Sequence, residues 1–271
     1  MRVECVPVLM YHRIGEARNE WERRYCISAT RFARHMDALA RAGWHALALD
    51  DFFAWLDGRL EFGRPSFLLT FDDGFRSVHD HAAGILRAKG WPATVFLVSG
   101  LLGATDEWCA TRNPAGSTYS LMGAREIDRL RADGFTFQSH TRTHADLTVL
   151  DDAALDQELT GSRSDLQDVL GERIDCLAYP YGKFDDRTVE AARASGYRAA
   201  FSTRPGFNRV GVHPYCIRRL EVYGTDSASA LKRKMMLGSN DGSVGHALRY
   251  GWSRIAARLR RTPLVGAGNP R

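Results

Sequence analysis

The sequence contains no run of 18 apolar residues, so it offers no segment that could cross a membrane as a single helix. It has only five cysteines, an odd number, and none forms a CxxC pair. This pattern predicts free thiols in a reducing compartment rather than a disulfide framework or a cysteine zinc site. The first residues also lack the apolar segment of a secretory signal peptide, and we therefore expect a cytoplasmic protein.

Acidic residues are scarce at the C-terminal end. The 271 residues carry a net charge of +5, but nine Lys/Arg and only Asp241 lie between Lys232 and Arg271. That segment carries +8, which leaves −3 for the preceding residues, so the basic pI says nothing about the substrate of the main domain. We expect no nucleic-acid partner. We expect one domain over residues 1–231 and a basic tail over residues 232–271, partly helical or disordered. The stretch 247–264 mixes arginines with Trp252 and leucines, a composition that suits contact with an anionic membrane. The protein could then bind peripherally to the inner face of the membrane. A solvated tail is the alternative.

Strand-like and helix-like segments alternate along the first 222 residues. We expect strands at Val6–Tyr11, Ser66–Phe71, Thr94–Val98, Phe135–Ser139, Ile174–Tyr179, Tyr197–Ser202 and Ile217–Val222. Helices are expected from Ser28 to Gly43, from about Ser120 to Gly134, from Asp151 to Leu170 and from Arg187 to Ser195. Repeated strand–helix units predict an α/β fold, and we expect a distorted, incomplete (β/α) barrel of about seven parallel strands.

The most informative segment is Thr70-Phe71-Asp72-Asp73-Gly74, which ends an apolar strand. Asp-Gly pairs are common in turns, so a structural role is the alternative. Two adjacent carboxylates at a strand end repel each other, however, and a bound cation would relieve that repulsion while leaving one carboxylate free to act as a base. The pair therefore suggests a metal-assisted hydrolase.

Two histidines follow a second strand about seventy residues later. His140 and His144 lie four residues apart, and Asp oxygen and His nitrogen both bind zinc-like ions. Because active sites of α/β barrels lie at the carboxyl ends of the strands, the two segments are expected to meet there. His12 also ends a strand and could be a general acid, although a structural histidine is the alternative.

A third segment, Tyr179-Pro180-Tyr181-Gly182, also follows a strand. It is either a simple turn or a turn that directs a backbone N–H, that of Tyr181, at a developing oxyanion. Among the aromatic residues, Trp108 and Tyr119 could line a sugar site, and we expect Trp108 and Tyr179 to contact substrate, although aromatic side chains more often belong to the core.

The order and spacing of TFDDG, His-Thr-x-x-His and Tyr-Pro-Tyr-Gly resemble the polysaccharide deacetylases of the NodB-homology superfamily (carbohydrate esterase family 4). The resemblance covers roughly residues 5–222. The start Leu-Met-Tyr-His-Arg-Ile at 9–14, the loop that contains Trp108 and the segment 217–220 look like the branch of the poly-β-1,6-N-acetylglucosamine deacetylases.

The resemblance implies roles for individual residues. Asp72 would be the catalytic base, and Asp73, His140 and His144 would hold one divalent metal ion, zinc being the expected one. Many family members have an arginine two residues before the proline of the third motif, where this chain has Ala178, so we expect the base to lack that partner. The C-terminal Leu-x-His that usually provides the general acid is also missing, and His12 looks like its replacement.

The sequence as a whole therefore predicts a metal-dependent N-deacetylase of N-acetylhexosamine units in a polysaccharide or its lipid-linked precursor. Two alternatives remain: a catalytically silent sugar-binding domain of the same fold, and an amidohydrolase that acts on a small cyclic amide. Intact Asp72, Asp73, His140 and His144 disfavour the first, because a site that only binds has no need of a base.

Overall fold

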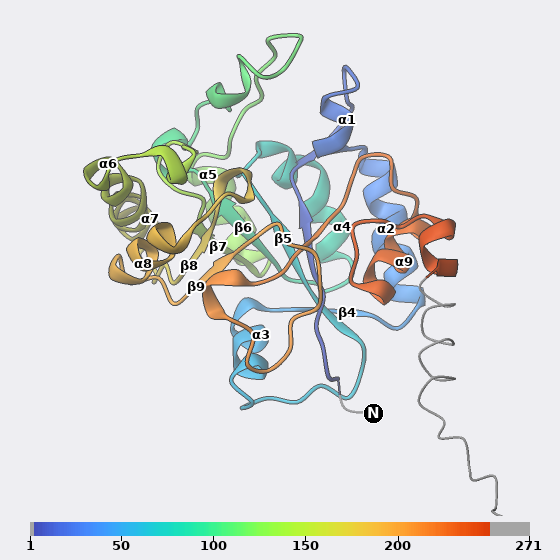
Figure 1. The fold of residues 1–271 in the computed structure, drawn as a ribbon. Coiled ribbons are helices and arrows are strands. Elements are labelled where there is room, and N and C mark those ends of the chain that lie inside the picture. The colour runs from blue at the N-terminus through green and yellow to red at the C-terminus, as the bar shows by residue number, and fades with distance from the viewer. Residues whose placement is uncertain (1–2, 250–271) are drawn as a thin grey trace, which may run out of the picture.

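In the computed structural model, which describes residues 3–249, parallel strands form one curled sheet with helices outside it (Figure 1). Seven strands follow one another in the order β10-β1-β5-β6-β7-β8-β9, and β4 pairs beside them with β5. Their bounds are β1 Val8–Tyr11, β4 His45–Leu47, β5 Ser66–Phe71, β6 Ala93–Leu97, β7 Phe135–Ser139, β8 Cys176–Ala178, β9 Ala199–Phe201 and β10 Leu220–Glu221. The expected incomplete α/β barrel is confirmed. A separate pair, β2 (Arg13–Ile14) and β3 (Cys26–Ile27), lies after β1.

The last segment of the sheet brings its two ends together. Ile217 forms a parallel bridge with Phe201 at the end of β9, and three residues later Leu220 pairs with Leu9 of β1. Residues 217–221 therefore span the space between the first and last strands of the barrel. The arginine in this short span, Arg219, is consequently carried into the interior, where its side chain is fully buried.

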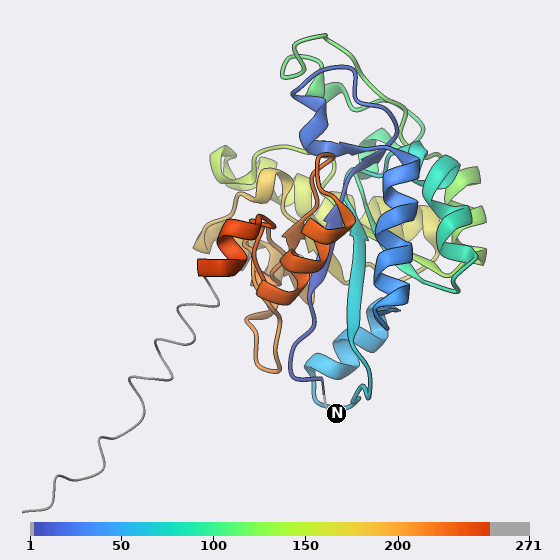
Figure 2. The same ribbon diagram turned by 90° about the vertical axis from the view of Figure 1, so that its right-hand side faces the viewer.

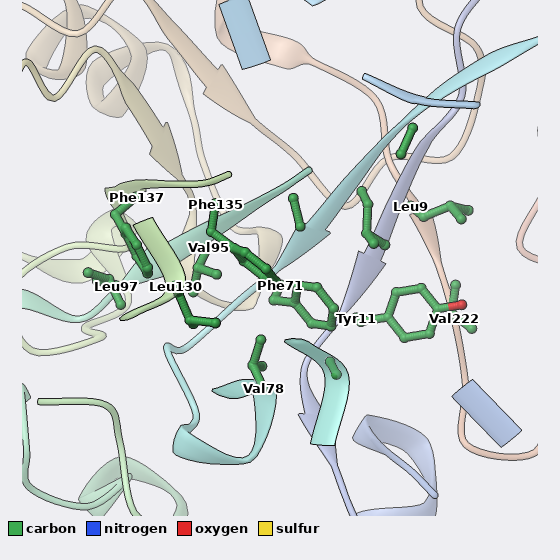
Figure 3. Close-up of a cluster of buried hydrophobic side chains, with 14 of the residues drawn as sticks. Leu9, Tyr11, Phe71, Val78, Val95, Leu97, Leu130, Phe135, Phe137 and Val222 are labelled. Carbon is green, nitrogen blue, oxygen red and sulfur yellow. The ribbon is translucent and has the colours of Figure 1, made fainter. Parts of the chain in front are cut away.

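One row of core side chains crosses four strands. Tyr11, Phe71, Val95 and Phe137 occupy paired positions on β1, β5, β6 and β7, and all are buried. Figure 3 shows these side chains beside Val78, which packs against them from the outer helical layer. Both faces of the central strands are covered, which explains why Ser66–Phe71 is a continuous buried run instead of an alternating one.

The helices form the outer layer, with α2 and α9 on one side and α6, α7 and α8 on the other (Figures 1 and 2). Their bounds are α1 Glu22–Tyr25, α2 Ala29–Arg41, α3 Leu49–Leu56, α4 Ala83–Arg87, α5 Ala124–Ala132, α6 Asp152–Asp156, α7 Ser162–Leu170, α8 Asp186–Ala194 and α9 Ala228–Leu237. The expected cap of α2 is present, because the Ser28 hydroxyl accepts a hydrogen bond from the Arg31 N–H.

Two expected helices differ in detail from the prediction. The helix expected from about Ser120 begins only after Gly123, because residues 120–121 are extended and form bridges with Thr105 and Phe75. The helix expected over residues 151–170 contains a π-helical turn, Gln157–Gly161, between α6 and α7. Two short elements, β4 and α3, were not predicted, because their patterns extend over too few residues to be distinctive.

The expected boundary at residue 231 falls inside α9. Leu231, Lys234 and Met235 of this helix are buried, and Lys234 donates hydrogen bonds to Asp226 and to the Glu221 carbonyl. Most of the expected basic tail, from residue 250 on, lies outside the described residues. Within the described part of the chain, no helix combines the length and the apolar composition that a membrane span requires.

Candidate active site

The motif residues meet in one cavity of about 180 Å³ at the carboxyl ends of the strands. Asp72 and Asp73 follow β5, His140 follows β7, and the turn Pro180–Gly182 follows β8. All three segments line this cavity, as do His12 and Trp108. The folding of a parallel sheet thus collects residues that lie up to 170 positions apart in the sequence into a single site.

The backbone of this site is strained. Four non-glycine residues of the described chain have positive φ, and all belong to the three motifs: Asp73 (72°), Thr141 (68°), His144 (63°) and Tyr181 (59°). A left-handed backbone conformation costs energy in a non-glycine residue. Such conformations are frequent at functional sites, where contacts with the surrounding structure maintain them. Gly74 is required here as well: its φ is 74°, and an added Cβ would come within 2.8 Å of Leu97.

Asp73, His140 and His144 form a triad that could hold a divalent metal ion. Their three ligand atoms lie within 4.8 Å of one another. The Asp73 Oδ1 atom is 3.4 Å from His140 Nε2 and 3.3 Å from His144 Nε2. Two ligands that each bind one zinc-like ion at about 2.0–2.2 Å in tetrahedral geometry are themselves roughly 3.4 Å apart. The residues therefore fit the metal that the sequence predicts.

Hydrogen bonding orients His140 for this role. Its Nδ1 lies 2.7 Å from the Ala178 carbonyl oxygen, which fixes the proton on Nδ1 and leaves the Nε2 lone pair facing Asp73. Burial lowers the pKa of His140, but Asp73 and Asp72 outweigh burial and raise it. His144 is the other histidine beside Asp73, and burial lowers its pKa. The lowered pKa favours the neutral imidazole, which is the form that binds a metal ion.

Aromatic side chains fix the His144 ring from two directions. The Trp108 ring stacks on it with centroids 4.5 Å apart, and the Tyr181 ring meets it edge-on at 4.6 Å. Within the described chain, His144 Nδ1 is the buried side-chain atom that lacks a hydrogen-bond partner. On the Nδ1 side, packing therefore takes the place of a hydrogen bond in orienting this imidazole.

Asp72 has an arginine partner after all, which corrects the expectation drawn from Ala178. Arg219 donates from Nη1 to Asp72 Oδ1 at 2.6 Å and from Nη2 to Oδ2 at 2.8 Å. Its Nε also donates to the Ser202 carbonyl at 3.0 Å, so the guanidinium is fixed by both groups. Burial raises the pKa of Asp72, but Arg219, His140 and His12 outweigh this and hold it below the ordinary value. Asp72 is thus ionised at neutral pH.

The loop that carries the histidines is fixed by Glu158, which the sequence analysis did not identify. This buried carboxylate accepts hydrogen bonds from the Arg142 and Thr143 N–H groups, each at 2.9 Å, and from the Thr143 hydroxyl. Glu158 lies in the π-helical turn Gln157–Gly161, which falls inside the helix predicted over residues 151–170 and has no distinctive sequence pattern. The clamp maintains the left-handed Thr141 and His144.

His12 follows β1 and lines the cavity beside Asp72. The two are neighbours because the Asp72 N–H donates to the carbonyl of Tyr11 at 2.9 Å. The His12 ring also meets Tyr25 at a centroid distance of 5.3 Å. This placement is compatible with the expected general acid, which remains a prediction.

The aromatic residues of the third motif have different surroundings. Tyr181 lies in the left-handed turn next to His144, where its N–H could serve the predicted oxyanion role. Tyr179, in contrast, is 1% exposed, its hydroxyl donates to the Tyr215 carbonyl, and its ring stacks on Phe184. These contacts make Tyr179 a core residue that also lies against the cavity, and its expected role in substrate binding stays a prediction.

The cavity has walls that the sequence analysis did not assign. Trp21, Arg24 and Tyr25 line it from one loop, and Asp106 and Arg112 from another. Burial raises the pKa of Asp106 to about 6. The Arg112 guanidinium lies 4.0 Å above the centre of the Tyr181 ring. A binding role could be suspected from the length of the loop that contains Trp108, but the sequence shows no signal for Trp21 or Tyr25.

Known proteins resemble this chain in both sequence and fold. YxkH of Bacillus subtilis, which carries the name of a polysaccharide deacetylase, is 23% identical over 225 residues, covering 83% of this chain and 74% of YxkH. The poly-β-1,6-N-acetyl-D-glucosamine N-deacetylase of Staphylococcus epidermidis is 22% identical over 192 residues, covering 66% and 62%.

Solved structures show the same fold. The Streptococcus pyogenes deacetylase PplD, in complex with acetate, superposes with a TM-score of 0.72 at 21% identity and covers 87% of this chain and 99% of PplD. IcaB from Ammonifex degensii superposes with a TM-score of 0.68 at 26% identity and covers 82% and 93%.

A model of the polysaccharide deacetylase family matches residues 60–200, slightly more than half of the chain. This range includes both aspartates, both histidines and the Tyr-Pro-Tyr-Gly turn. The expected family is therefore confirmed, and the chain belongs to the polysaccharide deacetylases.

Proposed function

We propose that this chain is a metal-dependent hydrolase that removes N-acetyl groups from N-acetylhexosamine units of a polysaccharide. The observation that carries the proposal is the placement of an arginine-bound carboxylate, Asp72, directly beside the Asp73–His140–His144 triad in one cavity. A site that only bound sugar would need no such base. The relatives that act on poly-β-1,6-N-acetylglucosamine support a glycan of this linkage as the first substrate to test.

The residues of the site divide the reaction between them. When bound, a divalent ion at Asp73, His140 and His144 would polarise the acetamide carbonyl and acidify water. Asp72 accepts the proton of the attacking water, which its lowered pKa permits at neutral pH. The Tyr181 N–H donates to the carbonyl oxygen as negative charge develops there. His12 then donates a proton to the leaving amine, so that the amide C–N bond breaks to give acetate and a free amino sugar.

Acetate release tests this proposal. Purified protein should release acetate from oligomers of β-1,6-linked N-acetylglucosamine, lose this activity with a chelator and regain it when zinc is added. Chitooligosaccharides serve as the comparison linkage. A protein that binds these oligomers without releasing acetate would instead be a silent binding domain, and turnover restricted to small cyclic amides would identify an amidohydrolase.

The location of the reaction is part of the same proposal. We place the enzyme in the cytoplasm, where it would act on a lipid-linked precursor and contact the anionic inner face of the membrane through the basic tail. The charge of +8 after residue 231 supports this idea. Removing residues 244–271 should then abolish co-sedimentation with anionic vesicles at low salt. Unchanged co-sedimentation would contradict it.

A further inference from the structure

Two loops rise above the carboxyl ends of the strands and face each other across the cavity. The first comprises residues 15–25 and includes α1, and the second comprises residues 101–120; we call them the α1 loop and the 101–120 loop. Both stand at the top of the molecule in Figures 1 and 2. Each contributes aromatic and cationic walls to the cavity: Trp21, Arg24 and Tyr25 from the first, and Trp108 and Arg112 from the second.

A single buried carboxylate joins the two loops. Glu22, whose side chain is 3% exposed, accepts hydrogen bonds at Oε1 from Asn113 Nδ2 (2.9 Å) and from the Tyr119 hydroxyl (2.7 Å), both in the 101–120 loop. At Oε2 it accepts from Arg13 Nη2 and from the Arg18 N–H, both at 2.8 Å. All four bonds point to one side chain, and its partners in the second loop lie more than 90 residues away.

Two further contacts reinforce the same junction. The Arg13 guanidinium lies 3.6 Å above the centre of the Tyr119 ring, and Asn19 Nδ2 donates to Asn113 Oδ1 at 2.9 Å. Burial raises the pKa of Glu22, but the four donors outweigh burial and hold it below the ordinary value, so the carboxylate is ionised at neutral pH. Charge-assisted bonds of this kind are about twice as strong as neutral ones.

We infer that Glu22 is a positioning residue that latches the α1 loop to the 101–120 loop and thereby holds the walls against which the sugar chain binds. The inference rests on the proposed function. The four hydrogen bonds of the Glu22 carboxylate go to residues of the two loops and to Arg13. None of these partners is Asp72, Asp73 or one of the two histidines of the site. Loss of the latch should therefore impair the use of a large glycan far more than the attack on a small acyl group.

Glu22→Gln is the discriminating variant. Both carboxylate oxygens accept from N–H groups, so whichever way the amide is oriented, its NH₂ group faces at least one N–H donor. Glu20→Gln is the matched control, because Glu20 lies in the same loop but its side chain is 81% exposed and, among residues 3–249, pairs with Arg23 on the surface. The two variants remove the same charge from the same loop.

The test compares a β-1,6-linked N-acetylglucosamine oligomer with a small aryl acetate. In Glu22→Gln, kcat/KM for the oligomer should fall about 10- to 100-fold, mainly through KM, because misplaced walls hold the sugar poorly. The aryl acetate should lose less than about threefold, and Glu20→Gln should match the wild type on both substrates. If Glu22→Gln lowers kcat/KM equally for both substrates, or for neither, the inference that Glu22 latches the two loops is wrong. A wild type that releases no acetate from any glycan but cleaves the aryl acetate would overturn the proposed function instead.

A second variant and a physical measurement complete the test. Tyr119→Phe removes one latch bond and keeps the ring under Arg13, so kcat/KM for the oligomer should fall less than in Glu22→Gln. In a double-mutant cycle, the decreases in kcat/KM of the two variants should not add. Amide hydrogen exchange should accelerate in residues 101–120 of Glu22→Gln but not in strands β5 to β7. Unchanged exchange in that loop, or fully additive losses, would contradict the inference.

Discussion

Arg219 donates two hydrogen bonds to Asp72, one to each carboxylate oxygen, across 147 residues of sequence. Both side chains are almost completely buried. The pair exists because residues 217–221 cross from β9 to β1 and close the curled sheet. The closure of the barrel thus provides an arginine partner for the predicted catalytic base, although this chain has Ala178 at the position where many family members have that arginine.

Replacing Arg219 with lysine should move the pH dependence of activity. Lysine keeps the charge but loses the two-pronged contact, so the pKa of Asp72 should rise from its lowered value. The carboxylate then becomes protonated at a higher pH as the solution is acidified. The acid limb of the kcat/KM profile should shift to higher pH, with a loss of roughly 10- to 100-fold at neutral pH. An unshifted acid limb would show that Arg219 does not tune the base.

Asp72→Asn should abolish most turnover while metal remains bound. A general base contributes about 10²- to 10⁴-fold, and Asn cannot accept the proton. The variant also leaves the buried Arg219 guanidinium uncompensated, which should lower the melting temperature. Elemental analysis and acetate release measured on the folded fraction separate these effects. Wild-type kcat in this variant would exclude Asp72 as the base.

His12→Ala tests the predicted general acid. Loss of the proton donor should lower kcat for the acetamide by about 10²- to 10⁴-fold, and less for an aryl acetate, whose leaving group departs without a proton. His81→Ala, a substitution of an exposed histidine, is the control. If His12→Ala retains near wild-type kcat on the glycan, His12 is structural and another residue acts as the acid.

His144→Ala should reduce bound metal and activity together, because it removes one of the three proposed ligands and the ring between Trp108 and Tyr181. Zinc content after equilibration with a weak chelator gives the occupancy, and circular dichroism checks the fold. Full occupancy in this variant would refute the assignment of His144 as a ligand.

Two substitutions of Glu158 should differ in metal affinity: Glu158→Gln should keep it and Glu158→Ala should lower it. In Glu158→Gln the amide oxygen can still accept the Arg142 and Thr143 N–H groups, and the NH₂ group can donate to the Thr143 hydroxyl. Glu158→Ala leaves both N–H groups without a partner, and metal affinity should fall roughly 10- to 100-fold. Metal titrations of both variants check this. Similar affinities in the two would show that the clamp does not orient His144.

The amino-acid sequence was enough to predict the strand–helix order, the curled α/β barrel and the residues of the three motifs. These depend on local patterns: apolar runs, caps such as Ser28, and Asp and His at strand ends. Because parallel strands place their carboxyl ends on one side, the convergence of Asp73, His140 and His144 could also be predicted.

The side chains that support the base and the predicted metal ligands could be identified only in the folded structure. Arg219 reaches Asp72 through barrel closure, and Glu158 reaches the histidine loop from a π-helical turn. Glu22 joins two loops by bonding Asn113, which lies 91 residues away. The folded structure also placed Tyr179 in the core, where its hydroxyl binds the Tyr215 carbonyl. These partners are distant in sequence and carry no local pattern. Their contacts depend on the curvature of the sheet and on loop packing, which exist only once the whole chain has folded.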